Sequence, residues 1–224
     1  LASLAHGFWV KPSQIFVEGI RHITPLDIQF ARRLGYCIKQ LGMVKKLGNK
    51  VQIAVHPALV PETHVLANVS DVFNAILVRG DIVGDTLHYG QGAGADATAS
   101  AVLSDLADAA LDLKNGSIGR VPPFVPHEQN GMVQSMDKAV SPFYLRLSVV
   151  DRPGTLAKIA AILGEAKIGI CSVTQPEGHV GESVPLILML HDAPDLAMRQ
   201  ALKKIARLSA IKAKPTMIRV ETFA

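Results

Sequence analysis

Residues 143–224 carry a succession of apolar patterns that limits how this part of the chain can fold. In the first run, Leu145, Leu147 and Val149 alternate with Arg146 and Ser148, which predicts a strand in a sheet with one buried face. Helical and strand patterns then follow in a regular order. We expect strand 143–150, helix 155–165, strand 168–175, strand 184–191, helix 194–208 and strand 216–221. The order βαββαβ predicts two helices covering one sheet around a small core.

This element order is the ferredoxin-like arrangement. The turn after its first strand reads Asp151-Arg-Pro-Gly-Thr-Leu156 and exposes backbone N–H groups at a helix start, where a carboxylate is favoured. Gly154 has no Cβ to keep a ligand from the main chain, and Asp151 offers an acceptor for an amino group. A free amino acid has both groups. The alternative is structural: Asp151 caps the helix and Gly154 makes the turn.

The first half of the chain predicts a mixture of helices and antiparallel strands. Thr24-Pro25 with Asp27 indicates a capped helix start, and Gly35 stands where that helix would end. A β-prone run at 15–19 precedes it. The expected strands that follow are 36–46 with 51–55, for which a continued helix is the alternative, and 71–78 with 82–89 around Arg79-Gly-Asp81. Pro57 and Pro61 are expected to break the pattern between these hairpins. The fold class is therefore α+β, with a mixed sheet and helices.

A helix beginning at Asp96 or Thr98 and ending near Lys114 is expected to follow the second hairpin. Its apolar stripe consists of Val102, Leu103, Leu106, Ala109, Ala110 and Leu113. From 115 to 142 the periodicity gives way to Gly, Pro and polar residues, which predicts a linker. We therefore expect two domains, 1–114 and 143–224, joined by the linker 115–142.

The composition excludes several classes of function. The chain is 49% hydrophobic and has no run of apolar residues long enough to span a bilayer, and its N-terminus has no signal-peptide pattern. We expect a soluble, cytoplasmic protein with no membrane partner. The 23 basic and 19 acidic residues are scattered, which gives no nucleic-acid footprint. The two cysteines, Cys37 and Cys171, are expected to be buried thiols, and no histidine spacing indicates a metal site.

A glycine-rich turn, Gly90-Gln-Gly92-Ala-Gly94, lies between an expected strand and an expected helix. It could hold a phosphate or a dinucleotide, but it is not a full G-x-G-x-x-G in a βαβ unit. The alternative is that the glycines only make a tight turn. Lysines of this half, such as Lys11 and Lys39, are expected to be solvated surface groups and not catalytic residues.

A longer series of short motifs surrounds this turn. In chain order they are Val17-Glu-Gly-Ile20, Leu34-Gly-Tyr36, Pro57-Ala-Leu-Val-Pro61, Leu66-Ala-Asn-Val69, Asn74-Ala75, Gly92-Ala-Gly94 and Thr98-Ala-Ser-Ala-Val102. Together they resemble homoserine dehydrogenase over nearly all of residues 1–114. His64-Val65 stands where the family usually has His-Pro, and Ala97 replaces a common proline.

The resemblance implies that 1–114 is the family's catalytic and dimerisation region, incomplete at its N-terminus. Gly92, Ala93 and Gly94 are then implied to contact the nicotinamide cofactor, NADP or NAD, with Thr98 as a weaker candidate. The family's catalytic Asp and Lys would lie upstream of Leu1, and its Rossmann domain is absent. No residue of this chain is therefore expected to be catalytic, and we expect the isolated chain to be inactive.

Residues 143–224, with Asp151-Arg-Pro-Gly-Thr-Leu-Ala-Lys-Ile-Ala160, resemble the ACT family of regulatory domains. Members of that family associate with one another and bind amino acids near this loop. The resemblance implies that Asp151, Pro153 and Gly154 bind an effector, which for an enzyme of threonine, methionine and isoleucine biosynthesis would be threonine.

The expected function is that of the C-terminal portion of a homoserine dehydrogenase, an oxidoreductase that interconverts aspartate semialdehyde and homoserine under feedback control. A homodimer or homotetramer is expected. The chain starts with Leu1 rather than Met, and residues 1–7 read like a helix already under way, which suggests a fragment. The alternative is a non-catalytic amino-acid-binding or oligomerisation module.

Overall fold

The computed structural model describes residues 1–6, 8–117, 132–176 and 181–223 and has the expected α+β class, with a mixed sheet and helices. The helices are α1 (Ala2–His6), α2 (Pro25–Arg33), α3 (Ala95–Asn115), α4 (Thr155–Glu165) and α5 (Asp195–Ile205), with 3-10 turns η1 (Pro12–Gln14), η2 (Val65–Asn68) and η3 (Met136–Lys138). The strands are β1 (Phe16–Val17), β2 (Tyr36–Leu47), β3 (Lys50–Pro61), β4 (Phe73–Gly80), β5 (Gly84–Gln91), β6 (Met132–Gln134), β7 (Val140–Val150), β8 (Ile170–Thr174), β9 (Ser183–Pro194) and β10 (Thr216–Val220).

Helix α2 begins and ends where the sequence predicts. The Asp27 carboxylate accepts hydrogen bonds from the backbone N–H of Thr24 at 2.8 Å and from its hydroxyl at 2.7 Å. Gly35 adopts a left-handed φ of 80° just beyond the last turn, a conformation that favours glycine. These two local signals fix the length of α2.

The predicted hairpin of β2 and β3 is confirmed, but β3 is longer than expected because Pro57 does not end it. Strand β3 pairs with β1 at Ala54 and Val55 and with β10 at Ala58 and Leu59. Pro57 therefore lies where β3 changes neighbours, so its missing N–H does not interrupt either ladder.

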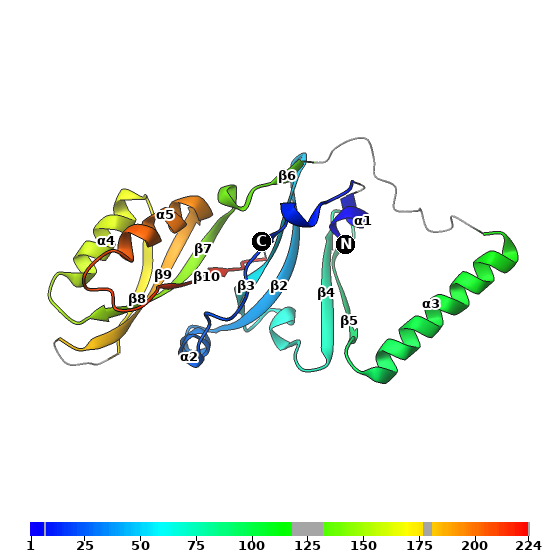
Figure 1. Ribbon diagram of the computed structural model, residues 1–224, viewed down its shortest axis with the longest axis horizontal. Coiled ribbons are helices and arrows are strands. Elements are labelled where there is room, and N and C mark those ends of the chain that lie inside the picture. Colours follow the sequence, from blue (N-terminus) through cyan, green and yellow to red (C-terminus); the bar gives the residue numbers. More distant parts are fainter. Residues whose placement is uncertain (7, 118–131, 177–180, 224) are drawn as a thin grey trace.

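An eight-stranded sheet joins the two halves of the chain (Figure 1). Its order is β1-β3-β10-β7-β9-β8, with β2 and β6 also paired to β3. The last six elements of the chain follow the βαββαβ order, and their strands lie in the order β10-β7-β9-β8. The parallel pairing of β10 with β3 makes the C-terminal strands continuous with the N-terminal ones.

Both faces of β7 are largely covered, which differs from the one-sided sheet that the alternation in 143–150 predicts. Phe143, Leu145 and Leu147 pack into a core with α4 and α5. Tyr144, between them, packs into a second core with Phe30 of α2. Arg146 is on the same face as Tyr144 and is therefore largely covered. The sequence pattern missed this because α2 comes from the other half of the chain.

The expected linker is shorter at its C-terminal end than predicted. Residues 118–131 lie outside the described residues. After them, Met132–Gln134 forms β6 and pairs with Lys50–Gln52 of β3, while β7 already starts at Val140. Met136 and Ala139 are buried against Ala54. Contacts with distant residues therefore order a segment whose own sequence has no periodicity.

Strands β4 and β5 and helix α3 form an arm that stands away from the large sheet (Figure 1). The predicted hairpin and helix are confirmed. None of the side chains of α3 is buried, so its apolar stripe is exposed in this chain.

Among the described residues, no helix is long and apolar enough to cross a membrane. Cys37 is half-buried, but Cys171 of β8 is exposed, so the expectation of two buried thiols is wrong for Cys171.

Candidate functional site

A cleft of about 380 Å³ opens at the turn between β7 and α4. It is lined by Val149, Val150, Asp151, Arg152, Pro153, Gly154, Thr155, Leu156, Gln175 and Leu186. The three residues that the sequence analysis assigns to an effector thus lie in one cleft. Gln175, which follows β8, and Leu186 of β9 complete the wall; both are distant in the chain from the loop, and the motif at 151–156 does not indicate them.

The main chain holds the loop of this cleft in place. The N–H of Asp151 donates to the carbonyl of Glu182 at 2.9 Å, and the hydroxyl of Thr155 donates to the carbonyl of Val150 at 3.2 Å. Within the described residues the Asp151 carboxylate makes no hydrogen bond or ion pair, and the N-cap position of α4 is occupied by Gly154. The alternative in which Asp151 caps the helix is therefore wrong.

Gly154 has a left-handed φ of 85°, so the interpretation as a turn glycine is correct for this residue. A Cβ built on it would meet no atom within 4 Å. The backbone conformation, and not a close contact, requires glycine here. The half-buried Asp151 and the uncapped start of α4 face the cleft together, which gives it an acceptor for an ammonium group and donors for a carboxylate.

The glycine-rich turn lies at the start of α3, at the opposite end of the molecule from this cleft (Figure 1). The N–H of Gly92 donates to the carbonyl of Val72 at 3.2 Å, and a Cβ at Gly92 would lie 2.3 Å from Nδ2 of Asn74. Gly94 is the N-cap of α3, with φ 114°. Gly92, Ala93, Gly94 and Thr98 are all exposed. The Thr98 hydroxyl donates to the carbonyl of Gly94 at 2.8 Å.

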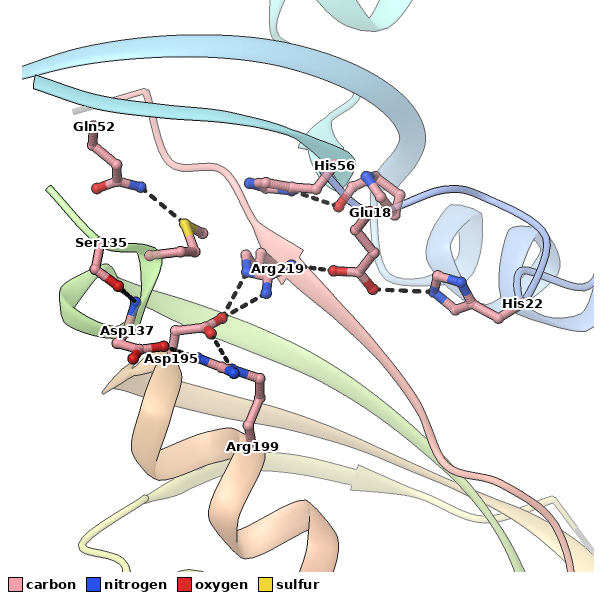
Figure 2. Close-up of polar contacts among 11 residues, drawn as sticks. Glu18, His22, Gln52, His56, Ser135, Asp137, Asp195, Arg199 and Arg219 are labelled. Atoms are coloured by element: carbon pink, nitrogen blue, oxygen red, sulfur yellow. Dashed lines mark hydrogen bonds and ion pairs between the residues drawn. The ribbon is translucent and has the colours of Figure 1, made fainter. Parts of the chain in front are cut away.

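A buried network of charged residues, which the sequence analysis missed, joins β10 to α5 and to the segment after β1. Figure 2 shows Arg219 of β10 between two carboxylates. Its Nε and Nη2 atoms donate to Oδ1 of Asp195 at 2.8 and 2.6 Å, and Nη1 donates to Oε2 of Glu18 at 2.7 Å. Arg199 of α5 pairs with the other oxygen of Asp195 and with Asp137.

A second network fastens α2 to β7. Arg146 donates from Nε to Oδ1 of Asp27 at 2.6 Å and from Nη2 to Oδ2 at 2.9 Å, and the Tyr144 hydroxyl donates to Oδ1 at 3.2 Å. Asp27 is fully buried. Burial by itself would raise the pKa of Asp27, but the hydrogen bonds from Arg146 and Thr24 outweigh it and lower that pKa. Burial is the main cause that raises the pKa of Tyr144.

His56 of β3 is also buried, and burial lowers its pKa. Its Nδ1 lies 2.9 Å from the carbonyl oxygen of Pro57, while Nε2 has no hydrogen-bond partner among the described residues. In the part of the chain that the structure describes, no group of three or more His, Cys, Asp or Glu side chains is placed to hold a metal ion.

A family model and curated proteins show what this chain is similar to. A family model described as homoserine dehydrogenase matches residues 1–107. The homoserine dehydrogenase of Neisseria gonorrhoeae is 37% identical over 226 residues, covering 100% of this chain and 52% of that protein. That of Pseudomonas aeruginosa is 36% identical over 225 residues, covering 99% of this chain and 52% of that protein. The chain spans about half the length of these curated relatives.

Solved structures of homoserine dehydrogenases are also similar to this chain. A homoserine dehydrogenase from Thiobacillus denitrificans matches 100% of this chain and 51% of its own length, with a TM-score of 0.89 and 37% identity. The enzyme of S. aureus at pH 6.0 matches 98% of this chain and 50% of its own length, with a TM-score of 0.65 and 28% identity. The fold is of the α+β class with a cleft at a strand-to-helix turn, and the relatives that the chain matches are oxidoreductases. The chain belongs to the homoserine dehydrogenase family.

Proposed function

We propose that this chain is the C-terminal portion of a homoserine dehydrogenase that interconverts aspartate semialdehyde and homoserine with NADP or NAD, in the cytoplasm. In this proposal residues 1–114 are the catalytic and dimerisation region, and 143–224 are a ferredoxin-like ACT domain. The observation that carries the proposal is the match to homoserine dehydrogenases along the whole chain, at 37% identity in sequence and with a TM-score of 0.89 in structure.

The turn at the start of α3 fits one side of a nicotinamide cofactor. It combines Gly92, where a Cβ would meet the side chain of Asn74, with an exposed helix N-terminus at Gly94, whose partial positive charge favours an anionic or strongly polar group. The bound cofactor would supply or accept the hydride. Gly92, Ala93 and Gly94 would contact it through the main chain. Thr98 is a weaker candidate because its hydroxyl hydrogen is already given to Gly94.

The cleft between β7 and α4 fits a free amino acid. Its carboxylate would accept hydrogen bonds from the N–H groups at the start of α4, and its ammonium group would donate to Asp151. Pro153 and Gly154 shape the loop, and Leu156 and Leu186 offer apolar surface to a side chain. We assign the cleft to threonine, the pathway product, acting as a feedback effector by binding one conformation more tightly than another.

Calorimetric titration with L-threonine tests the cleft. We expect binding heat from the 224-residue chain and a loss of affinity of about tenfold or more in Gly154→Val, because a β-branched residue is strained at a left-handed φ. Gly116→Val is the matched control, since Gly116 has a left-handed φ of 65° beyond the end of α3. Equal affinity in both variants, or no heat from the unaltered chain, would contradict the assignment.

Enzyme assays test the catalytic proposal. We expect the product of the complete coding region, including any residues encoded before Leu1, to oxidise NADPH or NADH with aspartate semialdehyde. The 224-residue chain alone should show no turnover, because the family's catalytic Asp and Lys are not among its matched motifs. Turnover by the isolated chain would show that the active site is misplaced. A complete product that binds threonine but reduces no semialdehyde would favour the alternative, a non-catalytic amino-acid-binding module.

A further inference from the structure

The segment between β1 and α2 is fastened to the C-terminal strands at both of its ends. At one end, Glu18 is paired with Arg219 of β10 at 2.7 Å (Figure 2). At the other end, Asp27 receives the two hydrogen bonds from Arg146 of β7. We refer to the pairs Glu18–Arg219 and Asp27–Arg146 as the two-point clamp. Everything between them, including the start of α2, must follow the positions of these two strands.

Burial makes the two-point clamp sensitive to geometry. The side chains of Asp27, Arg219, Arg146 and Glu18 are 0%, 3%, 14% and 26% exposed, so Asp27–Arg146 is the more deeply buried pair. A buried ion pair gains little over apolar packing when it is intact, but it is strongly unfavourable when its partners separate. Buried pairs therefore resist gradual displacement. Segment 18–27 has to move together with the arginines or exchange one set of partners for another.

Each arginine is also anchored on its own side of the clamp. Nη2 of Arg146 donates to the hydroxyl of Thr216 on β10 at 2.9 Å. Arg219 is held by Asp195, the first residue of α5. Contacts within the C-terminal half thus hold both guanidinium groups in place. From there they pair with carboxylates of the N-terminal half.

The strand that carries Arg146 leads directly to the cleft. Strand β7 ends at Val150, and Val149, Val150 and Asp151 all line the cleft. The other side of the clamp lies in the half that the family model matches, residues 1–107. The clamp is therefore a direct physical connection between the cleft and that half, without intervening loops.

We propose that the two-point clamp transmits occupation of the cleft to residues 18–33, so that a bound amino acid changes the position or stability of α2 and of the segment before it. The proposal rests on the proposed function of the cleft as an amino-acid site. Binding in the cleft fixes the end of β7, and Arg146 and Arg219 carry that constraint to Asp27 and Glu18. Because coupling is reciprocal, changes in segment 18–27 also alter affinity at the cleft.

Hydrogen–deuterium exchange of the 224-residue chain, with and without L-threonine, tests the proposal. We expect threonine to slow exchange about fivefold or more in peptides covering 18–33 as well as in 149–156, the lower limit of typical coupling. The test variant is the double substitution Asp27→Asn with Arg146→Met, which removes both charges together and leaves no unpaired ion. It should bind threonine by calorimetry and protect 149–156, but no longer protect 24–33, the part that Asp27 holds, since Glu18–Arg219 remains intact.

The matched control is Asp85→Asn with Arg79→Met, because this pair joins β4 to β5 with side chains 50% and 42% exposed. It should keep the full response. Protection of 24–33 in the test variant, or threonine binding without any response in 18–33 of the unaltered chain, would overturn the role of the clamp while leaving the effector site intact. Absence of binding heat in the unaltered chain would contradict the effector site, and with it the clamp.

Discussion

Asp27 illustrates how a single buried carboxylate can decide the stability of this fold. Its two oxygens accept hydrogen bonds from Arg146, Tyr144 and Thr24. Asp27→Asn would leave the guanidinium of Arg146 largely buried without a counter-charge. We expect a loss of about 3–5 kcal/mol in the free energy of unfolding, measured by urea denaturation at neutral pH. Asp85→Asn, in an exposed pair, should leave stability nearly unchanged.

The lowered pKa of Asp27 also gives this contribution a pH dependence. A carboxyl group whose pKa is lower in the folded state than its usual value of 3.8 stabilises the fold above that value. The contribution is then lost as the pH falls below 3.8 and through the folded pKa. Urea midpoints for the unaltered chain and for Asp27→Asn should therefore converge at acidic pH; a constant difference down to pH 2 would contradict the argument.

At the residue scale, the sequence could predict the cleft but not the buried charges. Asp151, Pro153 and Gly154 are adjacent in the chain, so one local motif brings them together. Arg146 is paired with Asp27, 119 residues away, and Arg219 with Glu18, 201 residues away. Arg146 also alternates with apolar residues, which is typical of a solvent-facing position. No local pattern distinguishes such an arginine from one that is covered by a helix from elsewhere.

Among the elements, the arm of β4, β5 and α3 exposes the most apolar surface. Exposed apolar side chains lie along both strands, the helix and the adjoining turns: Val72, Phe73, Ile76, Val78, Ile82, Val83, Leu87, Tyr89, Val102, Leu103, Leu106, Leu111 and Leu113. The rings of Phe73 and Tyr89 stack at 4.9 Å across the hairpin and form part of this surface. A surface of this kind is typical of protein–protein contact. We therefore propose that, in the homo-oligomer that the sequence analysis expects, the arm forms the contact.

Substitution in β4 tests this expectation. Val78→Asp puts a charge on a residue that is 48% exposed. We expect the dissociation constant of the oligomer, measured by sedimentation equilibrium, to rise about tenfold or more because the carboxylate would be desolvated in the contact. The control is Thr174→Asp in β8, which adds the same charge to an exposed position outside the arm. An unchanged dissociation constant in Val78→Asp would assign the contact to another surface.

Local signals predict elements well here, and long-range pairing explains the errors. The cap at Thr24 and the glycine at 35 determine where α2 begins and ends, and turn residues determine where both hairpins reverse. In contrast, β3 continues through Pro57 because β1 and β10 pair with it on either side of that residue. Strand β6 forms because it pairs with β3. Periodicity does not detect partners that are distant in sequence, so the sequence predicts a linker at β6 and a shorter strand at β3.

For the whole molecule, the continuous sheet bears on the proposed division at residues 114 and 143. In an isolated 143–224 fragment, β10 would lose its partner β3, and the face that packs on α2 would meet water. That face includes Tyr144, Ile187 and Ile218, which are at most 1% exposed in the whole chain. Exposing such a side chain costs about 1.5–3 kcal/mol each, and a domain has only about 5–15 kcal/mol of net stability.

We therefore expect the 143–224 fragment to unfold without a cooperative transition or to associate through its uncovered face. The measurement is urea denaturation followed by circular dichroism, combined with sedimentation equilibrium. The control is the fragment 143–224 with Tyr144→Ser and Ile187→Ser, which should associate less, because the uncovered face is more polar. A monomeric fragment that unfolds cooperatively, with a midpoint equal to that of the full chain, would instead establish 143–224 as an independent domain. In that case α2 would be only an attached helix, and the sheet that joins the two halves would contribute little to stability.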